Sequence, residues 1–203
     1  MNRCALLLIG MVAAVAGCAA QPTGGSPYPL PDGTSALRWG DGPYGVVLIP
    51  DGDRDAASWD ATARVLGDEG MTVVAVEGPD AAAAEAAIRQ LQADGIERVA
   101  VMAAGSGGNA AFALGVERPE LVDQLITLSA RGDVTRLGVF PKLFVASEDE
   151  GTAAEAVRMS EDAPGDWNAV FLARGDATGQ AILEGENGAE ALDAIVQRLE
   201  ERR

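Results

Sequence analysis

Short apolar runs, each followed by a segment with helical spacing, recur along most of this 203-residue chain. Three clear examples are Val46–Ile49, Thr72–Val76 and Val99–Met102. Continuous apolar runs of this length are typical of parallel strands that are buried on both faces. Because right-handed crossovers place the intervening helices on both sides of such a sheet, the pattern predicts an α/β fold. We expect a three-layer α/β/α sandwich with a mostly parallel, doubly wound sheet.

The remaining segments continue the same alternation. Further strands are expected within Leu121–Leu128 and at Lys142–Ala146 and Ala169–Leu172. In open parallel sheets, ligands bind at the carboxyl ends of the strands, so we expect the functional residues in the loops that follow the strands. The expected helices are Ala57–Asp68, Ala81–Ala93, Gly107–Val116, Thr152–Glu161 and Gly188–Glu200.

The charge of the chain excludes some classes of partner. Acidic residues number 31 against 15 basic ones, which gives a formal net charge of −16. Such a chain repels nucleic acid and anionic lipid, so neither is an expected partner.

The N-terminal segment predicts export. A short charged start is followed by an apolar run that is too short to span a membrane and ends in small residues, as in a signal peptide over residues 1–17. The ending Val15-Ala-Gly-Cys18 resembles the lipobox of bacterial lipoproteins. This resemblance implies lipidation of Cys18 and attachment to a bacterial envelope membrane, facing the periplasm or the cell surface. The alternative is an ordinary signal peptide that contains a cysteine.

Three parts are therefore expected along the chain. The signal peptide covers residues 1–17, and the lipidated Cys18 begins a flexible tether, rich in Pro and Gly, that extends to residue 36. The folded domain then covers residues 37–203. Since Cys4 lies in the segment removed on export, the mature chain contains no pair of cysteines for a disulfide.

The turn Ala104-Gly-Ser106-Gly-Gly108 carries the main catalytic motif. It follows an expected strand, precedes an expected helix and has small residues on both sides of Ser106. A nucleophile elbow needs this arrangement, and the N–H of Gly107 would then point toward an oxyanion. The stretch Gly105–Ala110 also fits the dinucleotide-binding pattern G-x-G-x-x-A. However, it follows a middle strand, and the next strand ends without an acidic residue for a ribose, so we expect no cofactor.

The order of these segments resembles the α/β-hydrolase family over roughly Leu37–Leu199. The run Val46–Gly52 stands at that family's first apolar strand and its following His-Gly. The Ser106 turn stands at the nucleophile, and Leu143–Asp149 resembles the segment that leads to the catalytic acid. The resemblance implies a minimal member without a cap domain, similar to dienelactone hydrolase, with Asp149 as the acid.

The chain departs from that family at the base. It contains no histidine, and Thr178 stands at the expected histidine position. A threonine hydroxyl cannot accept a proton near neutral pH, and losing the histidine of a comparable serine enzyme costs on the order of 10⁶ in turnover. Asp51 replaces the family's other histidine, and a carboxylate there disfavours an oxyanion. Only the N–H groups of Gly52, Asp53 and Gly107 remain as oxyanion donors.

Other bases and metals have little support in the sequence. Lys142, the only lysine, starts its strand at the end away from the site, and Asp149 or Asp176 would need a strongly raised pKa to act as a base. Without histidine or a free cysteine, only oxygen ligands remain for a metal. Asp51, Asp53 and Asp55 alternate like the start of a calcium loop, but the glycine and the distal glutamate are misplaced.

The sequence therefore favours a lipid-anchored envelope protein with a degenerate hydrolase site. It would bind a small ligand or another envelope protein in a crevice around Ser106, Asp51, Asp149 and Thr178. The alternative is a serine esterase or acyl hydrolase that uses Ser106 with a base other than histidine.

Overall fold

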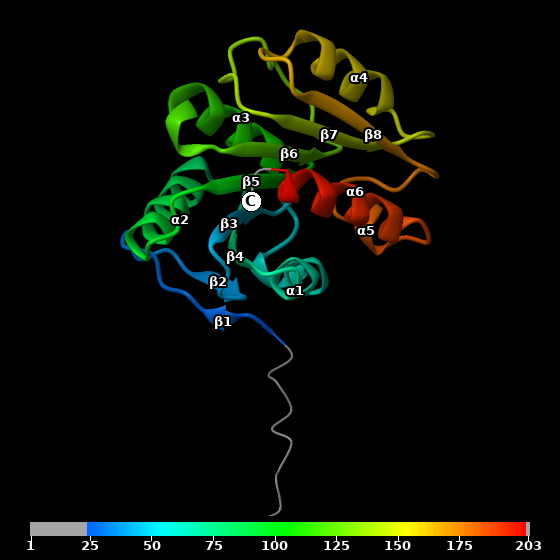
Figure 1. Cartoon of the computed structure of the whole chain (residues 1–203). Coiled ribbons are helices and arrows are strands. Elements are labelled where there is room, and N and C mark those ends of the chain that lie inside the picture. Colours follow the sequence, from blue (N-terminus) through cyan, green and yellow to red (C-terminus); the bar gives the residue numbers. More distant parts are fainter. Residues whose placement is uncertain (1–23, 202–203) are drawn as a thin grey trace, which may run out of the picture.

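An eight-stranded sheet forms the middle layer of the structure, a computed structural model that describes residues 24–201 (Figure 1). The strands lie in the order β1-β2-β4-β3-β5-β6-β7-β8. The six strands from β3 to β8 are parallel, and β2 pairs antiparallel with β4 at one side. The strands are β1 (Ser26–Pro27), β2 (Ala36–Trp39), β3 (Tyr44–Ile49), β4 (Met71–Val76), β5 (Val99–Ala104), β6 (Gln124–Leu128), β7 (Lys142–Ser147) and β8 (Asn168–Ala173).

Helices cover both faces of this sheet, as Figure 1 shows. Side chains of α2, α3 and α4 pack against one face, and side chains of α1, α5 and α6 pack against the other. The expected three-layer α/β/α sandwich is therefore confirmed. The helices are α1 (Asp60–Asp68), which follows a 3₁₀ turn at Ala56–Trp59, α2 (Ala81–Ala93), α3 (Gly107–Glu117), α4 (Ala153–Asp162), α5 (Ala181–Glu184) and α6 (Gly188–Glu200).

Burial on both faces explains the apolar runs of the sequence. In β3, Val46 and Leu48 enter the core beneath α1 and α6, whereas Val47 and Ile49 enter the core beneath α2 and α3. All four side chains are fully buried. Successive residues of a central strand point to opposite faces of the sheet, and helices cover both faces. No position along the strand therefore favours a polar side chain.

The start of the domain differs from the expectation of a tether to residue 36. Residues Ser26 and Pro27 pair with β2, and the side chain of Leu30 is buried in the same core as α2. The Tyr28 hydroxyl also donates to Asp94 at 2.7 Å. Leu30 stands alone among prolines, so no periodic signal marks it in the sequence, yet its side chain packs into the core. The expected signal peptide and Cys18 lie outside the described residues.

No helix within residues 24–201 is long and apolar enough to cross a membrane.

Lys142 begins β7 and is completely buried. Its ammonium donates to the carbonyl oxygens of Phe140 at 2.6 Å and Pro164 at 2.7 Å, and it lies 4.7 Å from the centre of the Phe140 ring. Burial lowers the pKa of Lys142 to about 8. The sole lysine of the chain thus acts as a structural link between β7 and the loop before β8.

This burial predicts a specific pH dependence of stability. Because the folded-state pKa is lower than the unfolded one, the unfolded chain binds more protons between about pH 8 and 10.5. The free energy of unfolding of the wild type, relative to Lys142→Met, should therefore rise between pH 7 and pH 10 by on the order of 2–3 kcal/mol. Denaturant unfolding of both proteins at each pH measures it. If the free energies of unfolding of the two proteins changed with pH in parallel, the Lys142 ammonium would not be desolvated.

Candidate functional site

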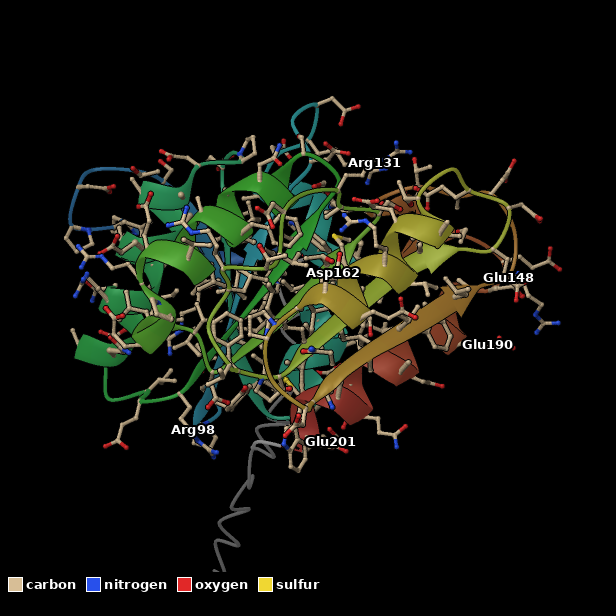
Figure 2. The ribbon with its side chains drawn as sticks, turned by 90° about the horizontal axis from the view of Figure 1, so that it is seen from above. Arg98, Arg131, Glu148, Asp162, Glu190 and Glu201 are labelled. Carbon is tan, nitrogen blue, oxygen red and sulfur yellow. The ribbon has the colours of Figure 1, made fainter. Side chains whose placement is uncertain are left out.

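The loops after five parallel strands meet at the carboxyl end of the sheet. In Figure 2, Arg131 and Glu148, which follow β6 and β7, lie far across the molecule from Arg98, which precedes β5. The loop residues that meet are Asp51 after β3, Gly105 and Ser106 after β5, Ser129 after β6, Glu150 after β7, and Gly179 and Gln180 after β8.

The strained position of the β5–α3 turn is Gly105, which corrects the expectation that Ser106 occupies it. Gly105 has a φ of +49°, whereas Ser106 has φ −67° and ψ −23°, which is ordinary helical backbone. In a nucleophile elbow the nucleophile sits on the strained residue, so this turn presents a residue without a side chain there. Small residues stand two positions before and after Gly105, at Ala103 and Gly107, just as they do around Ser106. The spacing of small residues therefore allowed either Gly105 or Ser106 at the strained position.

The carboxylate of Asp51 occupies the centre of the site. Its Oδ1 accepts a hydrogen bond from the Ser106 hydroxyl at 2.7 Å, from the Ser106 N–H at 3.0 Å and from the Gly52 N–H at 2.7 Å. The Gly52 N–H also lies 2.8 Å from Ser106 Oγ. Three donors from two loops therefore converge on one carboxylate oxygen.

Asp51 and a side chain at position 105 exclude each other. A Cβ added to Gly105 would lie 1.9 Å from Asp51 Oδ2 and 2.4 Å from Asp51 Cγ, far inside van der Waals contact. The aspartate therefore fills the space that a nucleophile on the strained residue would use. Gly105 is needed for both its positive φ and this close approach.

The same donors hold Asp51 in its charged form. Burial raises the pKa of Asp51, but hydrogen bonds from the side chain and backbone of Ser106 and from the Gly52 N–H outweigh it, and Arg54 adds a favourable charge. The net effect is a pKa below the usual value for aspartate. Hydrogen bonds to a charged form favour that form, so Asp51 is a carboxylate at neutral pH.

The donors around Asp51 are arranged like those of an oxyanion hole. In hydrolases with a nucleophile elbow, the oxyanion hole combines two backbone N–H groups. One belongs to the residue after the strained position, and the other belongs to a loop at the carboxyl end of a neighbouring strand. Here these groups are the N–H of Ser106 and the N–H of Gly52, and both donate to Asp51. The backbone donor on this side of Asp51 is thus Ser106 and not Gly107, which is the first residue of α3. Asp53 is exposed.

A second cluster contains the acidic residue that faces the site. Glu150 Oε2 accepts from the Ser129 hydroxyl at 2.7 Å, and Ser129 Oγ accepts from the Gly179 N–H at 2.8 Å. Ser129 has a φ of +53°, which brings its side chain between the two loops. Asp149, the expected acid, is exposed, and its backbone N–H donates to the carbonyl of Gly175. Both residues lie in the turn after β7, and this turn directs Glu150 toward Ser129 and leaves Asp149 in solvent.

The β8 loop approaches the turn through Gly179 rather than Thr178. A Cβ on Gly179 would lie 3.4 Å from Asp51 Oδ2 and 3.7 Å from the Gly105 nitrogen, whereas Thr178 is exposed. The next residue, Gln180, is buried and links two loops. Its Oε1 accepts from the Asp51 N–H at 3.3 Å, and its Nε2 donates to Ser58 Oγ at 2.9 Å.

The other groups considered from the sequence lie elsewhere. Lys142 is at the opposite end of β7, and Asp176 is exposed. Within residues 24–201, no group of three or more Asp, Glu or Cys side chains is arranged to hold a metal ion.

Comparisons with known proteins support the fold. A structure of a predicted CIB-like hydrolase from Thermoplasma acidophilum matches with a TM-score of 0.66 and 18% identity, covering 86% of this chain and 97% of that one. A monoacylglycerol lipase from Paleococcus ferrophilus matches with a TM-score of 0.71 and 13% identity, covering 88% and 100%. The chain therefore has an α/β-hydrolase fold. No family model matches the sequence, and no curated protein matches it.

The steric exclusion between Asp51 and position 105 is testable by a double-mutant cycle. Gly105→Ala should destabilise the wild type by about 2–4 kcal/mol, because it adds both a clash and an unfavourable φ. In an Asp51→Ala background only the backbone cost of about 1 kcal/mol should remain, giving a coupling of roughly 1–3 kcal/mol. Denaturant unfolding of the four proteins measures this coupling.

Gly95→Ala is the matched control for that cycle. Gly95 also has a positive φ, +94°, but no atom lies within 4 Å of its added Cβ. Its substitution should cost the same with or without Asp51. A Gly105→Ala cost that does not depend on Asp51 would contradict the exclusion.

Proposed function

We propose that this protein is a non-catalytic member of the α/β-hydrolase fold that acts by binding, as a scaffold or receptor on a bacterial envelope membrane. The observation that carries the proposal is the Asp51 carboxylate, which accepts both N–H groups of the oxyanion hole. A negatively charged transition state cannot use donors that already hold a carboxylate, and it would be repelled by that charge.

The absence of a nucleophile and a base supports the same proposal. Glycine occupies both the strained position 105 and position 179, where the β8 loop approaches it. The chain contains no histidine. Of the three elements of a catalytic triad, only an acid, Glu150, faces the site, and it is held by Ser129 rather than by a base.

The alternative is a serine ester hydrolase in which Asp51 activates Ser106. The 2.7 Å hydrogen bond from Ser106 Oγ to Asp51 Oδ1 is the observation in its favour. However, the pKa of Asp51 is lowered, and a general base whose pKa is far below neutral pH is too weak to take a proton from a hydroxyl efficiently. Ser106 would also have no oxyanion donors left, since its own N–H is engaged.

The surface beside the site suits a polar partner. A hollow of about 500 Å³ adjoins Asp51 and is lined by Gly52, Asp53, Arg54, Asp55 and Ser58. None of these residues offers a large apolar side chain, as a pocket for an acyl chain needs. Arg54 forms an ion pair with Glu184, which ties the β3 loop to α5. The segment 129–141 between β6 and β7 contains no helix or strand that would cap this surface.

Reaction with a fluorophosphonate tests the absence of catalysis. We expect no adduct on Ser106 by mass spectrometry after incubation with excess reagent, and no ester hydrolysis above that of Ser106→Ala. A serine hydrolase treated in parallel controls for the reagent. A stoichiometric adduct at Ser106, with ester hydrolysis that Ser106→Ala abolishes, would establish the alternative function.

We also propose the lipid anchor at Cys18, on the basis of the sequence Val15-Ala-Gly-Cys18. Cys18→Ser should move the protein from the membrane fraction to the soluble fraction of the producing bacterium, because several acyl chains are lost together. Cys4→Ser is the matched control and should leave the distribution unchanged. A Cys18→Ser protein that stays in the membrane fraction would contradict lipidation.

A further inference from the structure

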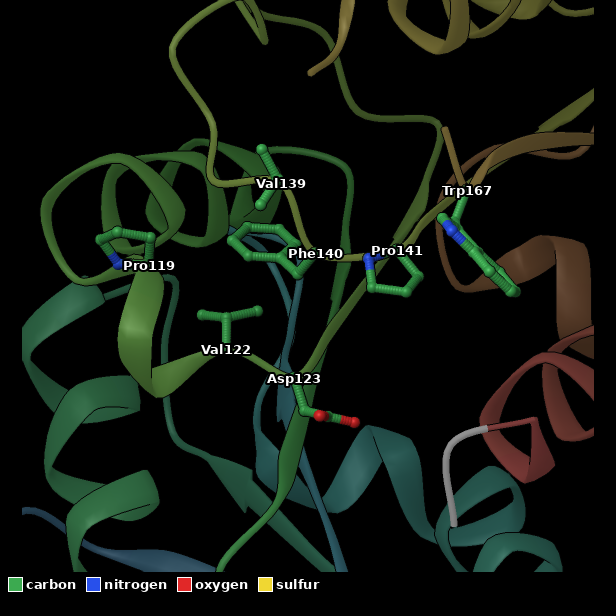
Figure 3. A pocket seen from close by; sticks show the side chains of 7 residues that line it. All are labelled: Pro119, Val122, Asp123, Val139, Phe140, Pro141 and Trp167. Atoms are coloured by element: carbon green, nitrogen blue, oxygen red, sulfur yellow. The ribbon is translucent and has the colours of Figure 1, made fainter. Parts of the chain in front are cut away.

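An apolar groove lies at the end of the sheet opposite the Asp51 site. Figure 3 shows its lining side chains, and its volume is about 380 Å³. Two of them, Val139 and Trp167, are 77% and 62% exposed. No other large apolar side chain among residues 24–201 exceeds 40% exposure. The groove is lined by Pro119, Val122, Asp123, Val139, Phe140, Pro141 and Trp167.

The lining residues come from the loops that precede three parallel strands. Asp123 directly precedes β6, Pro141 directly precedes β7, and Trp167 directly precedes β8. The groove therefore opens at the amino ends of the strands. A strand of six residues rises about 20 Å, so roughly this distance separates the groove end from the Asp51 end of the sheet.

The described chain begins at the same end of the sheet. Ser26 in β1 pairs with Arg38, and Trp39 at the end of β2 pairs with Val73 near the start of β4. Gly24 lines a hollow with Arg38 and Trp39. Residues before Gly24 therefore join the domain at the amino ends of the parallel strands. Trp167 lies at the same end but at the opposite edge of the sheet, since β1 and β8 are its two outer strands.

The tether to the proposed anchor is short. Because residues from Gly24 onward already belong to the domain, only residues 19–23 separate Cys18 from it. Six Cα–Cα steps reach at most about 21 Å when fully extended. A lipidated Cys18 would hold Gly24 within this distance of the bilayer surface, and the end of the sheet that carries Gly24 would face the membrane.

We propose that the groove around Trp167 and Val139 is a lipid-contacting surface, which binds the bilayer together with the anchor at Cys18. This inference rests on the proposed lipid anchor. Tryptophan favours the interface between headgroups and acyl chains, and one lipid signal is commonly reinforced by a second contact. Attachment at two points of one end fixes the orientation, so the Asp51 site faces away from the membrane toward its partner.

The polar groups at the groove allow this contact. Asp123 is its only acidic lining residue, and its carboxylate accepts from the Tyr44 hydroxyl at 2.8 Å. Since the whole chain carries a net charge of −16, anionic lipid does not attract the domain. The contact is therefore apolar, and it should form on zwitterionic phosphatidylcholine.

Depth-dependent quenching of tryptophan fluorescence tests the orientation. The chain from Cys18 onward contains every described residue and a single cysteine, which couples to maleimide-bearing lipid in phosphatidylcholine vesicles. Trp59 is buried and Trp39 is 8% exposed, so Trp167 alone of the three is open to a membrane quencher. We expect 5-doxyl phosphatidylcholine to quench the coupled wild type, and Trp167→Phe to lose this quenching.

Two further variants separate the groove from the rest of the surface. Val139→Asp should reduce the quenching at least severalfold, because it places a charge in the contact. Val157→Ser is the matched control, since Val157 is 40% exposed on α4 outside the groove, and it should quench like the wild type. Circular dichroism checks that each variant is folded.

The outcomes distinguish this inference from the proposed anchor. Chemical coupling supplies the attachment, so a failure of lipidation in cells leaves this measurement intact. No quenching of the coupled wild type, or equal quenching in Trp167→Phe, would overturn the lipid contact. Sedimentation of the uncoupled protein as a dimer that Trp167→Phe disrupts would assign the groove to a second copy and overturn it as well.

Discussion

The site is organised around the competition of one carboxylate and one backbone turn for the same space. Asp51 Oδ2 lies 1.9 Å from the place of a Cβ at position 105, so the residue there must be glycine. Glycine in turn allows the φ of +49° that lets β5 turn sharply into α3. The N-terminus of α3 and the β3 loop then aim their N–H groups at the carboxylate. An α/β-hydrolase fold thus has, at the turn after β5, two backbone N–H groups that donate to a carboxylate of the same chain.

The charge next to these N–H groups is the permanent one of the Asp51 carboxylate, whereas in an enzyme it is the transient charge of an oxyanion. An oxyanion hole is a preorganised set of donors for a charge that develops during a reaction. Here the similarly arranged donors hold the Asp51 carboxylate, which links the two loops and lowers the pKa of Asp51. Gln180 extends the same network to the β8 loop and to Ser58. These hydrogen bonds stabilise the loops at the position where a hydrolase would stabilise its transition state.

The two ends of the parallel sheet have different chemistry. The carboxyl end presents polar loops, including the hollow lined by Asp53, Arg54 and Asp55. The amino end presents the exposed apolar side chains of Val139 and Trp167 and the place where the chain enters the domain. A parallel sheet separates these surfaces by the length of its strands, so the proposed partner at one end and the proposed bilayer contact at the other would not compete.

The sequence by itself determined the layered sheet, because strands buried on both faces require continuous apolar runs such as Val46–Ile49. It also located the site loops, because parallel strands end together. The tertiary structure decided which residues of those loops meet. The loops bring together Asp51, Gly52 and Ser106, which the sequence had also singled out. Glu150 and Gly179, rather than Asp149 and Thr178, join them from the other loops. These two expectations were displaced by one residue, because backbone dihedrals, not spacing, select which residue of a loop points inward.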